Sequence, residues 1–451
     1  MKKTKIICTI GPSCDNNQTI KEMILSGMNV ARFNMSHGTH ESHLKSINKV
    51  REVREELGVP VSIMIDTKGP EVRVKDFKNK EEFLTDGQKF VLTTKDVEGT
   101  KDIVSITYKD FPSVVKKDTR ILVNDGLVEL KVTKVTDTDV ETKVIVGGKI
   151  SNKKAINVPN VDLKMPYISD VDREDIKFAC EQKADYIAIS FVSCAEDVKE
   201  VKKLLKKFGR PQMKIISKIE NSKGVKNAHE ILEESDGLMV ARGDLGVEVD
   251  FQKIPIIQKQ LIAECNNHRK LAVTATQMLE SMTTNSRPTR AEISDVANAI
   301  IDGTTAIMLS GETSAGLHPV LAVKTMAQIA TETEKATNQD EFSYFSAEDL
   351  SVEDGFAYGV CAVAYGEQAG AIVCDDYLLA QKIASFRPSE MVVYYSKEKD
   401  EYNQSSLLYN MISYYREKSV EDVCKKIKAE KLVSKDCAII VTTNNTIRVM
   451  K

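Results

Sequence analysis

Charged and hydroxyl side chains follow six of the predicted strands, at the point where each strand ends. In chain order these ends read Arg32-Phe33-Asn34-Met35-Ser36-His37, Asp66-Thr67-Lys68, Lys218-Ile219-Glu220-Asn221, Ala241-Arg242-Gly243-Asp244, Thr274-Ala275-Thr276-Gln277 and Ser310-Gly311-Glu312. The carboxyl ends of parallel strands open at one mouth of a barrel, so these groups should converge there. Ordinary solvated loop starts are the alternative, because every strand must leave the core somewhere.

The residue types at these ends suit a phosphorylated ligand and a hard metal ion. Glu220 and Asp244 are carboxylates on adjacent strands, and two carboxylates plus substrate oxygens are how Mg²⁺ is usually held. Arg32, Arg73 and Lys218 bring cationic donors to the same region, as phosphoryl transfer requires. The set therefore predicts a magnesium site that handles phosphate.

Two local arrangements support this prediction. Lys218 and Glu220 are two residues apart and face the same side of one strand, where together they can stabilise charge developing on an oxygen. A surface Lys–Glu pair is the alternative interpretation. Gly243 beside Asp244 lets two backbone N–H groups approach an anion such as a substrate carboxylate.

One motif imitates a transition-metal site. His37, His40 and His43 are three residues apart, and Glu41 lies among them. Because Gly38 interrupts the run, we expect positions at a helix start, with only His37 facing a ligand. The sequence contains no G-x-G-x-x-G, P-loop lysine or G-x-S-x-G motif, which disfavours a dinucleotide enzyme, a P-loop NTPase and a serine hydrolase.

Strands that alternate with helices must position these residues. Eight are predicted, at 5–10, 29–33, 61–65, 186–191, 214–219, 237–241, 271–275 and 306–309. Eight βα units in roughly 250 residues are typical of a TIM barrel, whereas a doubly wound open sheet usually has fewer strands. Residues 224–233 are predicted to form one helix.

The alternation is interrupted once and then gives way to another pattern. Between about 69 and 166 the sequence is β-rich with turn signals, which indicates an inserted β-barrel lid. A polar linker is expected at 335–345, followed by a smaller α/β domain. The predicted fold is thus an α/β TIM barrel in two parts, 1–69 and 167–335, with an inserted lid at 70–166 and a C-terminal domain at 336–451.

Composition limits the classes of function. The 451 residues include 63 Lys and Arg against 66 Asp and Glu, and this net charge of −3 argues against a nucleic-acid binder. The nine cysteines form no C-x-x-C pair, so free thiols are expected rather than disulfides or a zinc site. No apolar run approaches the roughly 20 residues of a membrane helix, and no signal-peptide core follows Met1. We therefore expect a cytoplasmic protein with no membrane partner.

These residues together resemble the pyruvate kinase family. The resemblance rests on motifs spread over residues 1 to about 330: Ile7-Cys8-Thr9-Ile10-Gly11-Pro12-Ser13, Ala31-Arg32-Phe33-Asn34-Met35-Ser36-His37-Gly38, Asp66-Thr67-Lys68-Gly69-Pro70-Glu71-Val72-Arg73, Ile216-Ser217-Lys218-Ile219-Glu220-Asn221, Val240-Ala241-Arg242-Gly243-Asp244-Leu245-Gly246, Thr274-Ala275-Thr276-Gln277-Met278-Leu279, Arg287-Pro288-Thr289-Arg290-Ala291-Glu292 and Met308-Leu309-Ser310-Gly311-Glu312-Thr313. It implies a glycolytic phosphotransferase that moves the phosphoryl group of phosphoenolpyruvate to ADP, giving pyruvate and ATP.

The resemblance also implies individual roles. Lys218, with Thr276 and Arg32, would be catalytic: Lys218 stabilises the transferring phosphoryl group and the enolate, and Thr276 lies near the carbon that is protonated. Mg²⁺ would be bound by Glu220 and Asp244, with a second Mg²⁺ arriving with the nucleotide. By the same resemblance, phosphoenolpyruvate would be bound by Arg32, Lys218, Gly243, Asp244 and Thr276. K⁺ would be bound by Asn34, Ser36, Asp66 and Thr67, and the nucleotide by Asn34, His37, Arg73 and Lys154.

Two further expectations follow from comparison with the family pattern. Glu71 stands where K⁺-dependent members have glutamate and other members have lysine, so a K⁺ requirement is expected. Many members bind a sugar phosphate on a hydroxyl-rich loop of the C-terminal domain. Here the loop carries Asp375 and Asp376, whose charges would repel a phosphate, so activation by fructose bisphosphate through that pocket is not expected. A homotetramer is expected from the resemblance alone.

Two other functions remain open from the sequence. One is a related Mg²⁺ barrel enzyme that makes or breaks carbon–carbon bonds through an enolate; it would share Glu220 and Asp244 but need neither the lid nor the K⁺ set. The other is a non-enzymatic descendant kept as a regulatory subunit, which would be expected to have lost Lys218 or a metal carboxylate.

Overall fold

Eight parallel strands close into a barrel in the computed structural model, which describes residues 2–161, 163–337, 350–417, 419–443 and 446–450. The order around the barrel is β1-β17-β16-β15-β14-β13-β3-β2. The strands are β1 (Lys5–Thr9), β2 (Val30–Asn34), β3 (Ser62–Asp66), β13 (Tyr186–Ile189), β14 (Lys214–Ile219), β15 (Gly237–Ala241), β16 (Leu271–Ala275) and β17 (Ala306–Leu309). The TIM-barrel prediction is confirmed, and closure excludes the open doubly wound sheet.

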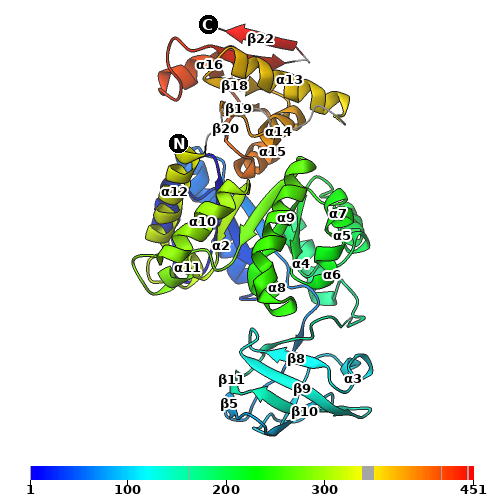
Figure 1. The fold of residues 1–451 in the computed structure, drawn as a ribbon. Helices are drawn as coiled ribbons and strands as arrows, with labels where there is room; N and C mark the ends of the chain where they lie inside the picture. Colours follow the sequence, from blue (N-terminus) through cyan, green and yellow to red (C-terminus); the bar gives the residue numbers. More distant parts are fainter. Residues whose placement is uncertain (1, 162, 338–349, 418, 444–445, 451) are drawn as a thin grey trace.

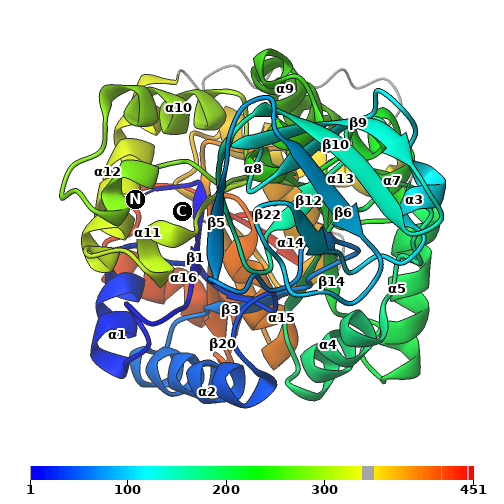
Figure 2. The same ribbon diagram turned by 90° about the horizontal axis from the view of Figure 1, so that it is seen from below.

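Helices form a ring around this barrel (Figure 2). They are α1 (Asn17–Ser26), α2 (His40–Leu57), α4 (Asp170–Glu181), α5 (Ala195–Lys207), α6 (Ser222–Lys226), α7 (Ala228–Glu233), α9 (Ile254–Asn267), α10 (Arg290–Ile301) and α12 (Pro319–Ala336). Two short helices, α8 (Arg242–Glu248) and α11 (Gly311–Ser314), follow β15 and β17 directly. Because helices cover the outside and side chains fill the inside, both faces of each strand are buried and the strands read as continuous apolar runs.

The prediction of one helix over 224–233 is wrong. The chain forms α6 and α7 instead, and Asn227 between them lies outside the helical region at φ −101° and ψ 16°. The Asn227 amide donates a 2.8 Å hydrogen bond to the carbonyl of Ser193 in the loop after β13. This tertiary contact fixes the break, and the helical periodicity of the segment gives no sign of it.

A β domain, β4 to β12, lies at one end of the barrel (Figure 1). One sheet of seven strands has the order β4-β12-β8-β9-β10-β6-β7, and β11 and β5 form a second sheet. The elements are β4 (Val72–Arg73), β5 (Glu81–Leu84), β6 (Lys89–Thr93), β7 (Ile103–Ser105), α3 (Phe111–Val114), β8 (Arg120–Val123), β9 (Val128–Val135), β10 (Asp139–Val146), β11 (Gly148–Ser151) and β12 (Ala155–Asn157). Its buried side chains form a hydrophobic core of their own, which explains why this block has a separate β pattern.

The opposite end of the barrel carries a C-terminal α/β domain with a five-stranded sheet in the order β20-β19-β18-β21-β22. Its elements are α13 (Val352–Gly366), β18 (Ala371–Cys374), α14 (Tyr377–Ser385), β19 (Met391–Ser396), α15 (Lys399–Gln404), β20 (Met411–Tyr415), α16 (Val420–Ala429), β21 (Ile439–Thr443) and β22 (Thr446–Met450). Of the predicted linker, 335 and 336 end α12, and most of the remainder lies outside the described residues.

The C-terminal domain closes the amino-terminal end of the barrel. Residues inside the barrel and residues of this domain belong to one buried apolar cluster. Polar contacts also join the strand starts to it: Lys5 Nζ donates to the Met411 carbonyl at 2.8 Å, the Ser62 hydroxyl shares a 2.6 Å hydrogen bond with that of Ser406, and Tyr186 Oη donates to the Gln404 carbonyl at 2.7 Å. The carboxyl ends of the strands are thereby left facing the β domain. Within the described residues, no helix combines the length and apolarity that crossing a membrane needs.

Candidate active site

A buried cluster of charges lies where β2, β3 and β14 end. Lys218 Nζ is 3.0 Å from Asp66 Oδ1 and 3.0 Å from Glu220 Oε1. The other oxygen of Asp66 accepts a 2.6 Å hydrogen bond from Arg32 Nε. We call Arg32, Asp66, Lys218 and Glu220 the charge cluster; these four side chains are at most 11% exposed.

The charge cluster holds Asp66 and Lys218 in their ionised forms. Burial alone would raise the pKa of Asp66, but the Arg32 and Lys218 cations outweigh it and hold that pKa below its usual value. Burial alone would lower the pKa of Lys218, but Asp66 and Glu220 raise it above its usual value. A fixed ammonium group is therefore present at the barrel mouth.

The pKa of Glu220 is raised, unlike that of Asp66. Burial raises its pKa to about 7, because the opposing effect of Lys218 is countered by the charges of Asp244 and Asp66. Its Oε2 accepts a 2.7 Å hydrogen bond from the backbone N–H of Phe191. A buried carboxylate crowded by two others fits a cation, since a hard divalent ion would relieve this repulsion. Glu220 and Asp244 thus form a donor set suited to Mg²⁺.

Gly243, Asp244 and Thr276 come together at the start of α8. The N–H of Gly243 donates a 2.8 Å hydrogen bond to Thr276 Oγ1, and a Cβ on Gly243 would lie 3.6 Å from that oxygen. Thr276 itself has φ +67°, a backbone conformation that non-glycine residues seldom adopt. Arg242 holds this turn, because its guanidinium donates to the Thr276 carbonyl at 2.6 Å and pairs with Asp295 at 2.7 Å.

The residues implied for K⁺ share the loop ends beside the charge cluster. Asn34 pairs with Asp66 across β2 and β3, and its Oδ1 accepts from the Ser36 N–H at 3.1 Å. Thr67 is buried, and its carbonyl accepts a 2.7 Å hydrogen bond from Ser190. Glu71 lies further along, where burial raises its pKa although Arg73 Nε donates to it at 2.6 Å.

The residues implied for the nucleotide contact other parts of the chain. Arg73 donates to the Lys153 carbonyl at 2.7 Å, and the Lys154 carbonyl accepts from the Val74 N–H, so both belong to the β domain. His37 is exposed on the loop after β2, and its carbonyl contacts His43 Nε2 at 2.7 Å. The structure therefore leaves these three outside the charge cluster.

The histidines that imitate a metal motif point to different partners. His40 Nε2 binds Asp175 at 2.6 Å and its ring stacks on Phe178, whereas His43 contacts the His37 backbone. Their rings do not converge on one point.

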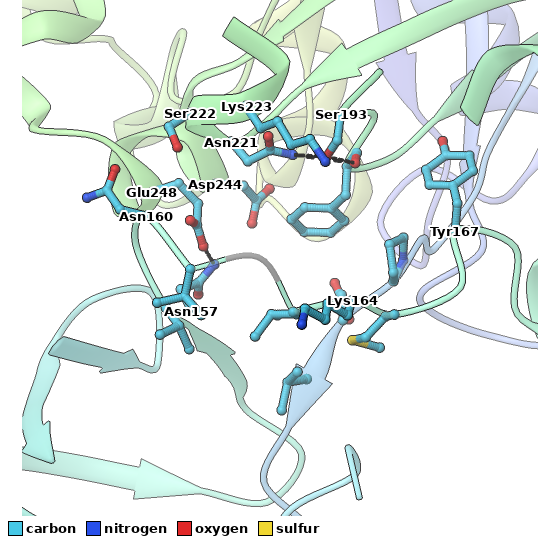
Figure 3. A pocket seen from close by; sticks show the side chains of 18 of the residues that line it. Asn157, Asn160, Lys164, Tyr167, Ser193, Asn221, Ser222, Lys223, Asp244 and Glu248 are labelled. Carbon is cyan, nitrogen blue, oxygen red and sulfur yellow. Dashed lines mark hydrogen bonds between the residues drawn. The ribbon is translucent and has the colours of Figure 1, made fainter. Parts of the chain in front are cut away.

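A cleft of about 600 Å³ separates the barrel mouth from the β domain (Figure 3). Asp244 and Glu248 line it from α8, and Asn157 and Lys164 line it from the chain leaving the β domain. A hydrogen bond from Asn157 Nδ2 to Glu248 Oε1, 2.8 Å long, crosses it. The β domain thus lies over the mouth and can limit the access of water to it.

Ser190 and Phe191, at the end of β13, were not predicted from the sequence to be site residues. The Ser190 hydroxyl accepts a 2.7 Å hydrogen bond from Lys218 and lies 3.3 Å from Asp66 Oδ1. The position of Ser190 at a strand end could have identified it as a site residue, since the predicted site residues also lie at strand ends. Phe191 acts through its backbone N–H at φ +55°, which leaves no signal in the residue type.

A closed barrel with a buried ammonium group, a guanidinium and two metal-suited carboxylates at its mouth defines a TIM-barrel enzyme for an anionic substrate. The family model described as pyruvate kinase, barrel domain, matches residues 1–323. The chain therefore belongs to the pyruvate kinase family.

Individual relatives agree with this assignment. A pyruvate kinase of Geobacillus stearothermophilus is 46% identical over 398 residues, 87% of this chain and 68% of its own. One of Clostridium perfringens is 48% identical over 335 residues, 74% of this chain and 71% of its own. A crystal structure of a pyruvate kinase from Cryptosporidium parvum superimposes with a TM-score of 0.94 at 34% identity, covering 100% of this chain and 96% of that one.

Binding of Mg²⁺ should weaken as the pH falls through about 7, the raised pKa of Glu220, because a proton then competes for the carboxylate. The folded metal-free chain holds this proton to a higher pH than the unfolded chain, so the contribution of Glu220 to stability increases as the pH falls from about 7 toward 4.5. The stabilisation that added Mg²⁺ gives should decrease over the same fall in pH, because Mg²⁺ then binds more weakly. Thermal unfolding with and without Mg²⁺ across this range measures both effects.

A Glu220→Gln variant is the control, since it has no carboxylate to titrate at this position. Stabilisation by Mg²⁺ that stays constant across this pH range in the unsubstituted chain would contradict the prediction.

Proposed function

We propose that this chain works as a pyruvate kinase, transferring the phosphoryl group of phosphoenolpyruvate to ADP and releasing pyruvate. The contact of Lys218 with both Asp66 and Glu220 carries the proposal, because it fixes one ammonium group beside a metal-binding carboxylate. Phosphoryl transfer requires little covalent work from the protein, so positioning and fixed positive charge supply most of the rate.

Each residue of the charge cluster has a part in this proposal. Arg32 and Lys218 bind the phosphate of phosphoenolpyruvate, and Lys218 then stabilises the enolate oxygen after the phosphoryl group has left. Asp66 holds both cations at the barrel mouth, because its carboxylate oxygens lie 2.6 Å from Arg32 Nε and 3.0 Å from Lys218 Nζ. Mg²⁺ on Glu220 and Asp244 would neutralise negative charge on the substrate oxygens.

Gly243 and Thr276 act at the other end of the substrate. In the proposal, the backbone N–H of Asp244, at the positive N-terminal end of α8, receives the substrate carboxylate, and the Gly243 N–H joins it after leaving Thr276 Oγ1. Thr276 lies beside the enolate carbon and helps to deliver the proton that converts enolate into pyruvate. Asn34, His37, Arg73 and Lys154 face ADP when the β domain closes over the mouth.

Further features are proposed from the family resemblance. The functional unit is a homotetramer in the cytoplasm, the lid spans 70–166, and the C-terminal domain spans 336–451. The rival Mg²⁺ barrel enzyme of carbon–carbon chemistry finds less support, because it would need neither the β domain over the mouth nor the oxygen set that includes Asn34 and Asp66. Pyruvate formation that depends strictly on ADP separates the two functions.

Replacing Lys218 by Met should reduce pyruvate formation at least about 1,000-fold, because the charge that stabilises the transferring group is lost. The measurement couples pyruvate release to lactate dehydrogenase in the presence of phosphoenolpyruvate, ADP, Mg²⁺ and K⁺. Lys214→Met is the matched control: it removes a lysine from the other end of β14, where Lys214 pairs with Asp236 at 3.1 Å. Comparable rates in the two variants would refute the role of Lys218.

Activity should require K⁺. Glu71 supplies no positive charge near the mouth, and Asn34, Ser36, Asp66 and Thr67 offer oxygens to a monovalent cation. Replacing K⁺ by a bulky organic cation at constant ionic strength should lower the rate at least about 10-fold, since such a cation cannot enter the oxygen cage. Undiminished turnover in the organic salt rules out this requirement.

Fructose bisphosphate should not activate the enzyme through the loop after β18. The carboxylate of Asp376 accepts a 2.7 Å hydrogen bond from the Leu379 N–H, so it caps α14 where a phosphate would otherwise bind. Rates measured against phosphoenolpyruvate concentration should give the same curve with and without the sugar phosphate. A shift from a sigmoidal to a hyperbolic curve contradicts this prediction.

A further inference from the structure

Two histidines and a glutamate gather on the outer surface of the barrel, away from its mouth. His229 begins the first turn of α7, and Glu264 and His268 lie one turn apart at the end of α9. These two helices lie side by side in the helical ring (Figure 1). Among the described residues, these three form the one group in which at least three metal-ligating atoms from different residues lie within 4.8 Å of one another.

We propose that His229, Glu264 and His268 bind one zinc-class divalent cation that braces α7 against α9. Two imidazoles and one carboxylate are a donor set that Zn²⁺ accepts, with water completing the tetrahedron. Ligands about 2.1 Å from a tetrahedral ion lie roughly 3.4 Å apart. His229 Nδ1 and Glu264 Oε1 are 2.8 Å apart, and the three ligand atoms all lie within 4.8 Å of one another, so modest side-chain movements would reach that edge.

The hydrogen bond made by the His268 ring matches one that commonly surrounds bound metals. Metal-ligating histidines usually donate their second N–H to a carbonyl or carboxylate, which fixes the tautomer. His268 Nδ1 lies 2.9 Å from the Glu264 carbonyl and 3.5 Å from Glu264 Oε1; with Nδ1 held by the carbonyl, the side chain must move to bring Nε2 to the ion. His229 Nδ1 lies 2.8 Å from Glu264 Oε1 and is therefore its ligand atom, whereas Nε2 is 3.7 Å from Glu233 Oε1, beyond hydrogen-bond distance.

The backbone that carries the cluster is already held in place. Lys270, just beyond His268, donates to the carbonyls of Leu232 and Glu233 at 2.6 and 2.9 Å and so ties the segment after α9 to the end of α7. The three ligating side chains remain 30 to 63% exposed. Adjustment to an ion therefore needs movement of solvent-exposed side chains only.

The metal must displace the proton that His229 and Glu264 share. Because a ligating histidine nitrogen must be free of its proton, binding should strengthen as the pH rises and should release a proton. Mg²⁺ will not compete, because it prefers oxygen ligands and octahedral geometry.

Calorimetric titration of Zn²⁺ into the full chain tests the proposal, after chelator treatment and with excess Mg²⁺ to occupy Glu220 and Asp244. The expected result is one bound Zn²⁺ per chain and a raised temperature of thermal unfolding. His229→Ala and His268→Ala should each weaken this binding at least about 10-fold and remove the thermal shift. The substitutions change an exposed and a partly exposed side chain, and unaltered unfolding temperatures without metal will show that the fold is kept.

Two further variants make the result specific. His318→Ala removes a histidine at the start of α12 and should bind Zn²⁺ like the unsubstituted chain. Glu233→Gln keeps all three ligands and should also bind Zn²⁺ like the unsubstituted chain, because Glu233 Oε1 lies 3.7 Å from His229 Nε2, beyond hydrogen-bond distance. The proposal is overturned if the chain binds no Zn²⁺, or if His229→Ala and His268→Ala bind Zn²⁺ as tightly as the unsubstituted chain; in the second case the ion is held elsewhere, for example by the partly exposed Cys194 or Cys437.

Discussion

The contact between Lys218 and the carboxylates of Asp66 and Glu220 is the interaction on which the rest of the site depends. A buried charge is costly unless it is paired, and here Arg32 and Asp66 complete a network whose formal charges cancel. Removing any one partner would leave a buried charge without compensation. All four side chains of the charge cluster must therefore be present together, and this requirement fixes the relative positions of the ends of β2, β3 and β14.

The register of the barrel strands sets the relative positions of these strand ends. Asn34 lies opposite Asp66, and Lys218 lies opposite Met239, so adjacent parallel strands end at nearly the same level. The C-terminal domain shares an apolar core with the barrel at the other end and holds the strand starts. The mouth is thus rigid on the side of the barrel, whereas the β domain has its own core and reaches α8 through Asn157 and Glu248.

The strands were predictable because burial on both faces gives each a short, continuous apolar run. β14, β15, β16 and β17 have the predicted limits in the structure. The sequence prediction failed where a tertiary contact overrides local pattern. Asn227 breaks a helical segment by binding the Ser193 carbonyl, and α8 begins at the very end of β15 without any apolar periodicity. β4 and β12 are two and three residues long, too short for an alternating pattern to emerge.

The sequence by itself determined the eight-strand barrel, the separate β block and the positions of the charged strand ends, because apolar runs and polar strand ends follow from burial. Only the tertiary structure decided which of those ends make contact. It brought Ser190 to Lys218 and the Phe191 N–H to Glu220, left Arg73 and Lys154 on the β domain, and joined His229 to Glu264 across 35 residues. Such contacts depend on strand order, register and backbone direction, which residue type and spacing along the chain do not encode locally.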